Sequence, residues 1–194
     1  MAMAFDAEDD RSDEALLALY GRGDPVAARV LTGRLAPIAL RVAYRMLGDL
    51  AEAEDVAQEA MLRLWKQAPD WQGGGAKVST WLYRVVANLA TDRLRRRRSV
   101  PLDAAPEPVD AAPGAVGRMI EADRAAALDL ALMDLPDRQR QAVVLRHLEG
   151  LGNPEIAGIM GVGVEAVESL IARGKRGLTE ALSGRRTELG YGDD

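Results

Sequence analysis

The chain has 194 residues and a hydrophobic content of 48%, which suffices for one ordinary domain or for two small domains with packed cores. It has no cysteine, and this excludes a disulfide framework, a thiolate zinc site and a cysteine nucleophile. The formal net charge of -5 argues against a nucleic-acid partner only if the charges are evenly spread, and they are segregated along the chain.

Residue usage favours an all-α fold, because helix-forming residues are abundant and there is a single phenylalanine. The first residues are acidic where a secretory signal needs basic ones, and no apolar run approaches the roughly 18 residues of a membrane span. We therefore expect a cytoplasmic protein. The single histidine, His147, has no partner at a catalytic spacing, and the Gly73–Gly75 run lacks the ending of a phosphate loop, so neither an enzyme nor a cofactor or metal site is expected.

Two helices are predicted before residue 50. The first is a short helix over residues 13–20. The second begins where Asp24 can cap it and Pro25 fits the first helical position, and its apolar residues recur at helical spacing to about Leu47. Gly48 should end this helix.

The next segment, AEAEDVAQEAMLRLW (residues 51–65), has two contrasting sides. Its apolar stripe is made of Ala53, Val56, Ala57, Ala60, Met61, Leu64 and Trp65. The other side carries Glu52, Glu54, Asp55, Gln58 and Glu59. An acidic side does not suit DNA, and the residues alone leave open whether it docks on a basic partner or is solvated surface.

A glycine-rich loop over residues 69–75 should precede a helix capped by Ser79. The predicted inner face of this helix is Leu82, Val85, Val86, Leu89 and Leu94. Trp81 and Tyr83 lie near the loop, and residues 84–98 have a net charge of +5. Aromatic rings beside cations suit unstacked bases. The alternative is a core tryptophan followed by a solvated helix end.

Residues 100–117 contain four prolines and two glycines, which predicts a flexible linker. We expect two small helical domains over 1–98 and 119–186, a linker over 99–118 and a tail over 187–194. In the second domain, helices are predicted over 119–133, 136–149, 153–160 and 164–182.

The last two predicted helices form a helix-turn-helix. Asn153 and Pro154 start the first one, and Gly161 ends it. Ile156, Ala157 and Met160 should pack against Val162, Val167 and Leu170. This geometry places a recognition helix in a major groove. The alternative is a helical hairpin that never meets DNA.

Three segments together resemble the extracytoplasmic-function (ECF) sigma factors of bacterial RNA polymerase, within the sigma-70 family. They are AEDVAQEAMLRLW, STWLYRVVANLATDRLRR and LPDRQRQAVVLRHLEGL with the helix-turn-helix after it. The resemblance runs from about Asp13 to Leu182. It implies a transcription initiation factor that binds core RNA polymerase, directs it to promoters and helps to open the DNA. It also implies control by an anti-sigma factor.

The resemblance assigns roles to particular residues. Contact with the clamp helices of the largest polymerase subunit falls to Asp55, Gln58, Glu59 and Leu64. Recognition of the minus-ten element falls to Lys77, Trp81, Arg84, Asn88, Arg93, Arg95 and Arg96, with Asp92 matching the pattern, while the loop around 71–77 captures a flipped base. Recognition of the minus-thirty-five element falls to Glu165, Ala166, Glu168, Ser169, Arg173, Lys175 and Arg176. The flap region of the polymerase is a further implied partner.

The recognition helix departs from the family pattern at two positions. Glu168 and Leu170 stand where cations are usual, although Glu168 suits a cytosine amino group. Gly174 replaces a common alanine and should cost about 1 kcal/mol of helix stability.

Two other functions fit parts of the same pattern. A stand-alone helix-turn-helix regulator needs only residues 119–182 and would bind its operator without polymerase. An adaptor that mimics a sigma factor would bind an anti-sigma factor without supporting transcription. Dependence of DNA binding and initiation on core polymerase separates these alternatives.

Overall fold

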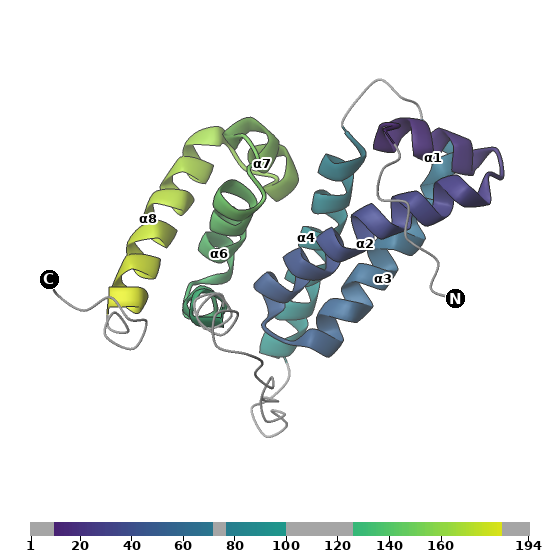
Figure 1. Cartoon of the computed structure of the whole chain (residues 1–194). Coiled ribbons are helices and arrows are strands. Elements are labelled where there is room, and N and C mark those ends of the chain that lie inside the picture. Colours follow the sequence, from purple (N-terminus) through teal and green to yellow (C-terminus); the bar gives the residue numbers. More distant parts are fainter. Residues whose placement is uncertain (1–9, 72–76, 100–125, 184–194) are drawn as a thin grey trace, which may run out of the picture. The chain divides into compact units, whose positions relative to one another are not determined.

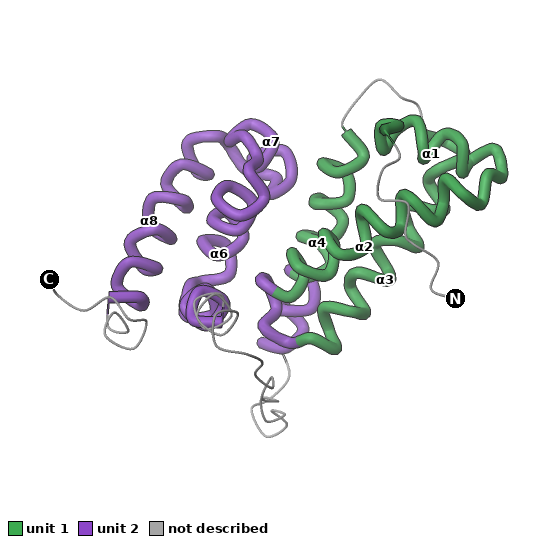
Figure 2. The backbone as a smooth tube through the Cα atoms, viewed as in Figure 1, with its two compact units in different colours: residues 1–44, 50–90 green, residues 45–49, 91–194 purple. Residues whose placement is uncertain are grey.

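The computed structural model describes residues 10–71, 77–99 and 126–183, and the regular elements in these ranges are all helices (Figure 1). The all-α prediction is confirmed. The chain forms two compact units, Met1–Tyr44 with Leu50–Ala90 and Arg45–Asp49 with Thr91–Asp194 (Figure 2). The predicted domain boundaries stay predictions, and the segments predicted as linker and tail lie outside the described residues apart from Ser99.

The described residues of the first half of the chain form four helices and one short 3-10 turn: α1 (Asp13–Gly21), α2 (Pro25–Leu47), α3 (Leu50–Gln67), η1 (Ala68–Asp70) and α4 (Val78–Ser99). The start of α2 is as predicted. Asp24 Oδ1 accepts hydrogen bonds from the backbone N–H groups of Val26, at 2.8 Å, and Ala27, at 3.2 Å. Gly48, with a φ of 69°, follows its last residue.

The apolar stripe predicted for α3 is confirmed as its core face. Its buried members are Ala53, Val56, Ala57, Ala60, Met61 and Leu64. Trp65 is only half-buried, with its ring centroid 4.5 Å from that of Tyr20 in α1. Small alanines on this face let neighbouring helices approach closely while the larger residues fill the remaining space.

The predicted start of α4 is wrong by two residues, because the helix begins at Val78, and Ser79 lies inside it rather than capping it. The backbone nitrogen of Val78 instead donates to Glu14 Oε1 of α1 at 3.1 Å. The buried face of α4 also differs from the prediction: it consists of Val78, Leu82, Tyr83, Val86, Ala87 and Ala90. Tyr83 is therefore a core residue, whereas Val85, Leu89 and Leu94 are half-buried.

The later part of the chain has a helix over 126–133, followed by α6 (Asp137–Val143), the π-helical turn η3 (Val144–Leu148), α7 (Asn153–Met160) and α8 (Val164–Ser183). Gly152 rather than Asn153 caps α7, and the backbone nitrogen of Gly152 donates to Glu155 Oε2 at 3.0 Å. Gly161 ends α7 in the left-handed conformation with a φ of 63°, as predicted.

Gly174 is buried in α8, where the helix passes close to α6. A Cβ atom at this position would lie 2.5 Å from Val143 Cγ2 and 3.2 Å from the carbonyl oxygen of Gln139. The expectation that glycine merely weakens the helix is therefore incomplete. Glycine costs helix propensity here, but it permits a contact that alanine would obstruct.

We predict that Gly174→Ala lowers the free energy of unfolding by about 1 to 2 kcal/mol, because the methyl group overpacks the contact with Val143 and Gln139. Gly177→Ala is the matched control, since its methyl group would meet only the end of the Leu135 side chain, at 2.6 Å. Urea titration, monitored by circular dichroism, measures the free energy of unfolding of both variants. A Gly174→Ala protein as stable as the wild type would contradict this account of the helix contact.

Candidate nucleic-acid and partner-binding surfaces

The side of α3 opposite the core carries the predicted acidic surface. Asp55 and Gln58 are exposed. Glu59 is partly exposed and pairs with Arg63 at 2.8 Å, and this hydrogen bond lowers the pKa of the Glu59 carboxyl. A pair between two half-exposed side chains adds little stability. The surface is therefore free to exchange this contact for one with a partner at small cost.

Leu64 does not belong to this surface, because its side chain is 0% exposed and packs in the core. Its assignment as a contact residue is corrected: it supports α3 from beneath. Leu62, which the sequence analysis missed, is 52% exposed and follows Gln58 by one helical turn. The signal was available, since Leu62 is an apolar residue outside the core stripe.

Four of the predicted minus-ten residues share one side of α4. Trp81, Arg84, Asn88 and Arg95 recur at steps of three, four and seven, which places them along one face. Arg84, Asn88, Arg95 and Arg96 are exposed, as is Lys77 just before the helix, whereas Arg93 is half-buried. Arg95 pairs with exposed Asp92 at 2.8 Å.

Trp81 is half-buried and meets Trp71 edge to face, with ring centroids 6.2 Å apart and an interplanar angle of 83°. In the chain, Trp71 precedes and Trp81 follows the segment 72–76, which lies outside the described residues. The predicted base-capturing loop therefore has an aromatic pair near its two ends, one ring from the residue that follows η1 and one from the first turn of α4. Trp81 is both a packing residue and an accessible ring.

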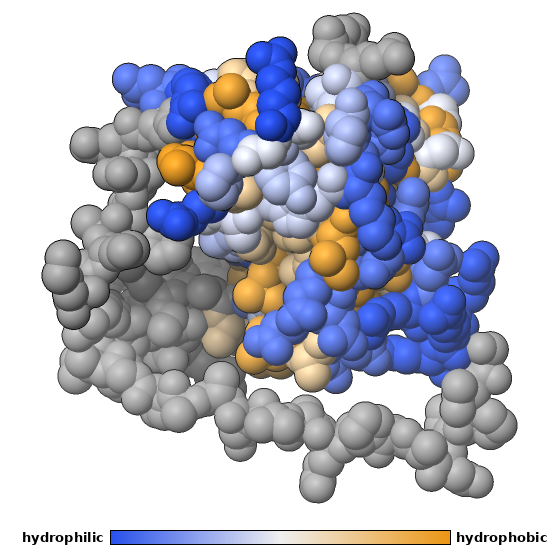
Figure 3. All heavy atoms as spheres, turned by 90° about the vertical axis from the view of Figure 1, so that its right-hand side faces the viewer, coloured by the Kyte–Doolittle hydropathy of each residue, from blue (hydrophilic) through white to orange (hydrophobic). Residues whose placement is uncertain are grey.

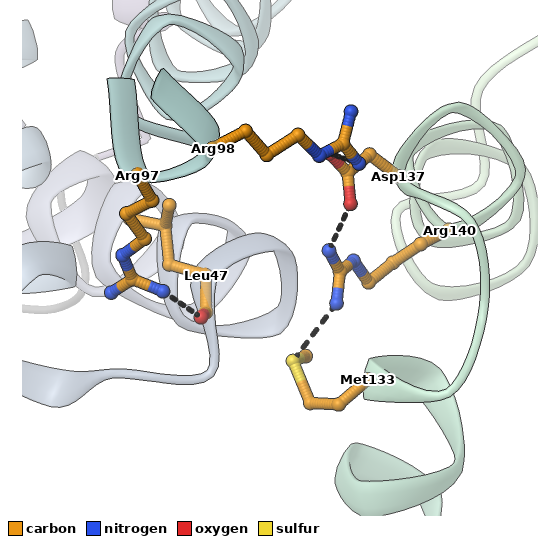
Figure 4. A network of polar contacts seen from close by, with 6 residues as sticks. All are labelled: Leu47, Arg97, Arg98, Met133, Asp137 and Arg140. Carbon is orange, nitrogen blue, oxygen red and sulfur yellow. Dashed lines mark hydrogen bonds and ion pairs between the residues drawn. The ribbon is translucent and has the colours of Figure 1, made fainter. Parts of the chain in front are cut away.

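The last two arginines of the basic run are engaged within the second unit (Figure 4). Arg97 donates to the carbonyl oxygen of Leu47 at 3.2 Å and lies 3.5 Å from Asp49 Oδ2. Arg98 pairs with Asp137 at 2.6 Å. The net charge of the basic run is therefore larger than the number of its arginines that are available to bind DNA phosphates.

Asp137 also holds Arg140, which is the only buried charged residue among those described. Arg140 is 5% exposed, lies 2.7 Å from Asp137 Oδ1 and donates to Met133 Sδ at 3.1 Å (Figure 4). Burial lowers the pKa of the Arg140 guanidinium, while the carboxylate of Asp137 opposes that shift. This network at the start of α6 had no signal in the sequence, because it depends on side-chain burial.

The helix-turn-helix is formed by α7 and α8, as predicted. Ile156, Ala157 and Val167 are buried at its centre. Ile159 is also buried, whereas Met160, predicted for the core, is half-buried with Val162 and Leu170. The predicted contact residues of α8 are all exposed: Glu165, Ala166, Glu168, Ser169, Arg173, Lys175 and Arg176.

Two of these predicted contact residues have side-chain partners within the chain. The Asn153 amide lies 3.5 Å from Glu168 Oε1, at the limit of a hydrogen bond. Arg173 Nε donates to the carbonyl oxygen of Ser169 at 3.2 Å. Both contacts are exposed and weak, so DNA could replace them.

An apolar cavity of about 260 Å³ lies in the second unit, between α8 and the helices before it. It is lined by Leu128, Leu132, Val143, His147, Leu148, Lys175, Leu178, Thr179 and Leu182. Burial lowers the pKa of His147, and the charges of Lys175 and Arg146 lower it further. His147 is therefore neutral at pH 7 and suits an apolar lining.

The described residues contain no group of three or more metal-binding side chains. Within the same ranges, no helix is long and apolar enough to cross a membrane. On the face seen in Figure 3, polar and charged residues dominate, and hydrophobic residues form separate small patches among them. Contacts made by that face would depend mainly on polar groups.

Comparisons with known proteins agree on one family. The Sigma-70 region 2 model matches residues 31–100, and the Sigma-70 region 4 model matches residues 125–178. The chain is 36% identical over 156 residues to the ECF RNA polymerase sigma factor SigE of Mycolicibacterium smegmatis, covering 76% of this chain and 58% of that longer protein. It is 33% identical over 181 residues to the ECF RNA polymerase sigma factor SigM of Mycobacterium tuberculosis, covering 93% and 90%.

Among solved structures, CnrH in complex with the cytosolic domain of CnrY is similar, with a TM-score of 0.64 and 27% sequence identity. That match covers 90% of this chain and 99% of CnrH. Region 2 therefore includes α3 and α4, and region 4 includes the helix-turn-helix. The chain belongs to the ECF sigma factors of the sigma-70 family.

Proposed function

We propose that this sigma factor binds core RNA polymerase through α3, opens and reads the minus-ten element through α4, and reads the minus-thirty-five element through α8. One observation carries the proposal: each of these helices buries its apolar face and exposes the polar residues that the family pattern assigns to a partner. The protein has no catalytic activity of its own and acts in the cytoplasm.

The polymerase contact is made by Asp55, Gln58 and Glu59, with Leu62 adding apolar area beside them. Acidic and amide side chains on a rigid helix suit the basic residues of the clamp helices, because opposite charges steer the encounter. Leu62 then supplies the desolvated contact that a purely charged surface lacks. The apolar cavity beside α8 suits an apolar side chain from the flap region.

Promoter opening uses the aromatic and basic face of α4. Trp81 offers a ring edge-to-face with Trp71, and a base that leaves the duplex stacks best on such a ring. Arg84, Asn88 and Arg95 follow along the same side and meet the backbone of the strand.

Upstream recognition uses the first turns of α8. The Glu168 carboxylate can accept a hydrogen bond from a cytosine amino group once its contact with the Asn153 amide is broken. Ser169 and Arg173 lie close to Glu168 on the same helix. Lys175 and Arg176 contact phosphates. An acid in this position makes the preferred minus-thirty-five sequence different from one read by a cation.

We also propose that an anti-sigma factor holds this protein in check. CnrH, its structural relative, was solved in complex with the cytosolic domain of CnrY. A partner that covers the α3 surface would prevent binding to the polymerase, because both ligands would need the same side chains.

In vitro transcription from genomic fragments tests the function as a whole. Core polymerase with this protein should start at specific sites, and core polymerase alone should not. A stand-alone regulator would instead shift its operator without polymerase, and an adaptor would bind an anti-sigma factor but support no initiation.

We predict that Asp55→Arg combined with Glu59→Arg lowers affinity for core polymerase by about 100-fold or more, because repulsion replaces attraction at the clamp helices. Affinity is measured by fluorescence anisotropy of labelled protein. The double variant Asp10→Arg with Asp134→Arg is the control, since both aspartates are exposed and lie outside the proposed surfaces. Unchanged affinity in the first variant would refute the role of α3.

We predict that Trp81→Ala slows promoter opening by about tenfold while initial closed binding changes less than threefold, because stacking matters only after a base is unpaired. A fluorescent base analogue in the minus-ten element reports opening. Trp81→Phe keeps a ring and should recover most of the rate. Equal losses in both steps would make Trp81 a purely structural residue.

We predict that Arg176→Ala weakens promoter binding similarly for all sequences and reduces the slope of log K against log salt by about 1, as expected for one lost phosphate contact. Titrations of holoenzyme on promoter DNA at several salt concentrations measure the slope. Arg29→Ala is the control, because Arg29 is an exposed cation of α2 outside the proposed surfaces. If both variants have the wild-type slope, Arg176 does not meet phosphate.

A further inference from the structure

Helix α1 contacts residues that come just before Trp71 in the chain and also Val78, where α4 begins. At the upstream side, Gly21 lies so close to η1 that a Cβ atom there would be 3.0 Å from the carbonyl oxygen of Ala68. At the downstream side, the backbone nitrogen of Val78, at the start of α4, donates a hydrogen bond to Glu14 Oε1 at 3.1 Å. One short helix thus joins the two ends of the segment between Trp71 and Val78.

The contact of Glu14 replaces a local cap. The first backbone N–H groups of a helix have no acceptor within it, and Val78 is fully buried, so water cannot serve instead. The carboxylate also lies at the positive end of the helix dipole. The hydrogen bond from Val78 lowers the pKa of Glu14, and the charge of Lys77 contributes less. Glu14 is therefore ionised at neutral pH and holds the start of α4.

The close approach at the other side is steric rather than electrostatic. Gly21 is the last residue of α1, and the absence of a side chain lets the helix end rest on the backbone of Ala68 and Pro69. Ala68 is buried, which fixes η1 against the core directly before Trp71. A larger residue at position 21 would push η1 away.

We propose that α1 is a brace that sets the relative position of Trp71 and Trp81, and that Glu14 is a positioning residue for the capture of an unpaired promoter base. The edge-to-face contact of the two rings depends on the positions of η1 and of the first turn of α4. The brace fixes both. The ligand is a base of single-stranded DNA, so this inference rests on the proposed function.

The effect should appear as base discrimination rather than as overall affinity. Phosphate contacts along α4 remain when the brace is loosened, because they come from exposed side chains beyond its first turn. Selection of a base needs rings held in a fixed geometry, since a misplaced ring stacks less well. Loss of the brace thus reduces the preference for a correct base more than it reduces binding of the strand.

The experiment uses full-length protein with core polymerase and single-stranded non-template oligonucleotides that span a minus-ten element mapped by in vitro transcription. Each base is replaced in turn by an abasic site, and the affinity ratio of intact to abasic strand is measured. Glu14→Ala should lower the largest ratio by about fivefold or more, as expected when part of the stacking of one base on the rings is lost. Glu14→Gln keeps an acceptor and should lie between this variant and the wild type.

Two further variants make the result specific. Asp10→Asn removes an exposed carboxylate near α1 and should keep the wild-type ratio. Gly21→Ala disturbs the other end of the brace and should lower the same ratio as Glu14→Ala, at the same base. Affinity for core polymerase should stay within about twofold in every variant, because α3 does not depend on this hydrogen bond.

The outcomes separate the two proposals. If the wild-type protein supports no initiation, the proposed function fails. If the wild-type protein does support initiation but folded Glu14→Ala keeps the wild-type affinity ratio, the proposal that α1 is a brace is wrong and the proposed function stands. Should Glu14→Ala not fold, Glu14→Gln and Gly21→Ala decide, and wild-type ratios in both would overturn the inference.

Discussion

The structure depends on helices that bury one apolar face at close range and leave the opposite face polar. In α3, Ala53, Ala57 and Ala60 bring neighbouring helices close, and in α8 the absence of a side chain at Gly174 does the same against Val143. Close approach fixes the rotation of each helix about its axis, since interiors are packed too densely to slip. The exposed side of each helix is thereby fixed as well, and all three proposed surfaces are such exposed sides.

Contacts between residues far apart in the chain then connect the fold to its proposed use. The start of α4 is held by Glu14, 64 residues away, so the helix that presents Trp81 is placed by the helix that opens the domain. At the start of α6, Asp137 pairs with Arg98, 39 residues away, and also satisfies the buried guanidinium of its helix neighbour Arg140. A buried charge without such a partner would cost several kcal/mol, so these contacts restrict how the elements can be arranged.

The charge of each helix surface differs from the net charge of the chain. The chain has a net charge of -5, yet α4 carries six arginines and α8 has three cations within residues 173–176, while acidic residues lie on the side of α3 opposite its core face. Not all cations of a basic run are available, because Arg97 and Arg98 bind Leu47 and Asp137. Local charge predicts where DNA can bind, while the contacts within the protein decide how many cations remain for it.

The sequence by itself determined the helices, the core stripe of α3, the ends at Gly48 and Gly161 and the family, because helical periodicity, capping and motif order are local properties. Tertiary structure decided that a carboxylate from α1 caps α4 in place of Ser79, that Tyr83 is core, and that Gly174 allows a close contact. Each of these depends on a residue distant in the chain, and no local pattern encodes which atoms a folded chain brings within hydrogen-bonding or van der Waals distance.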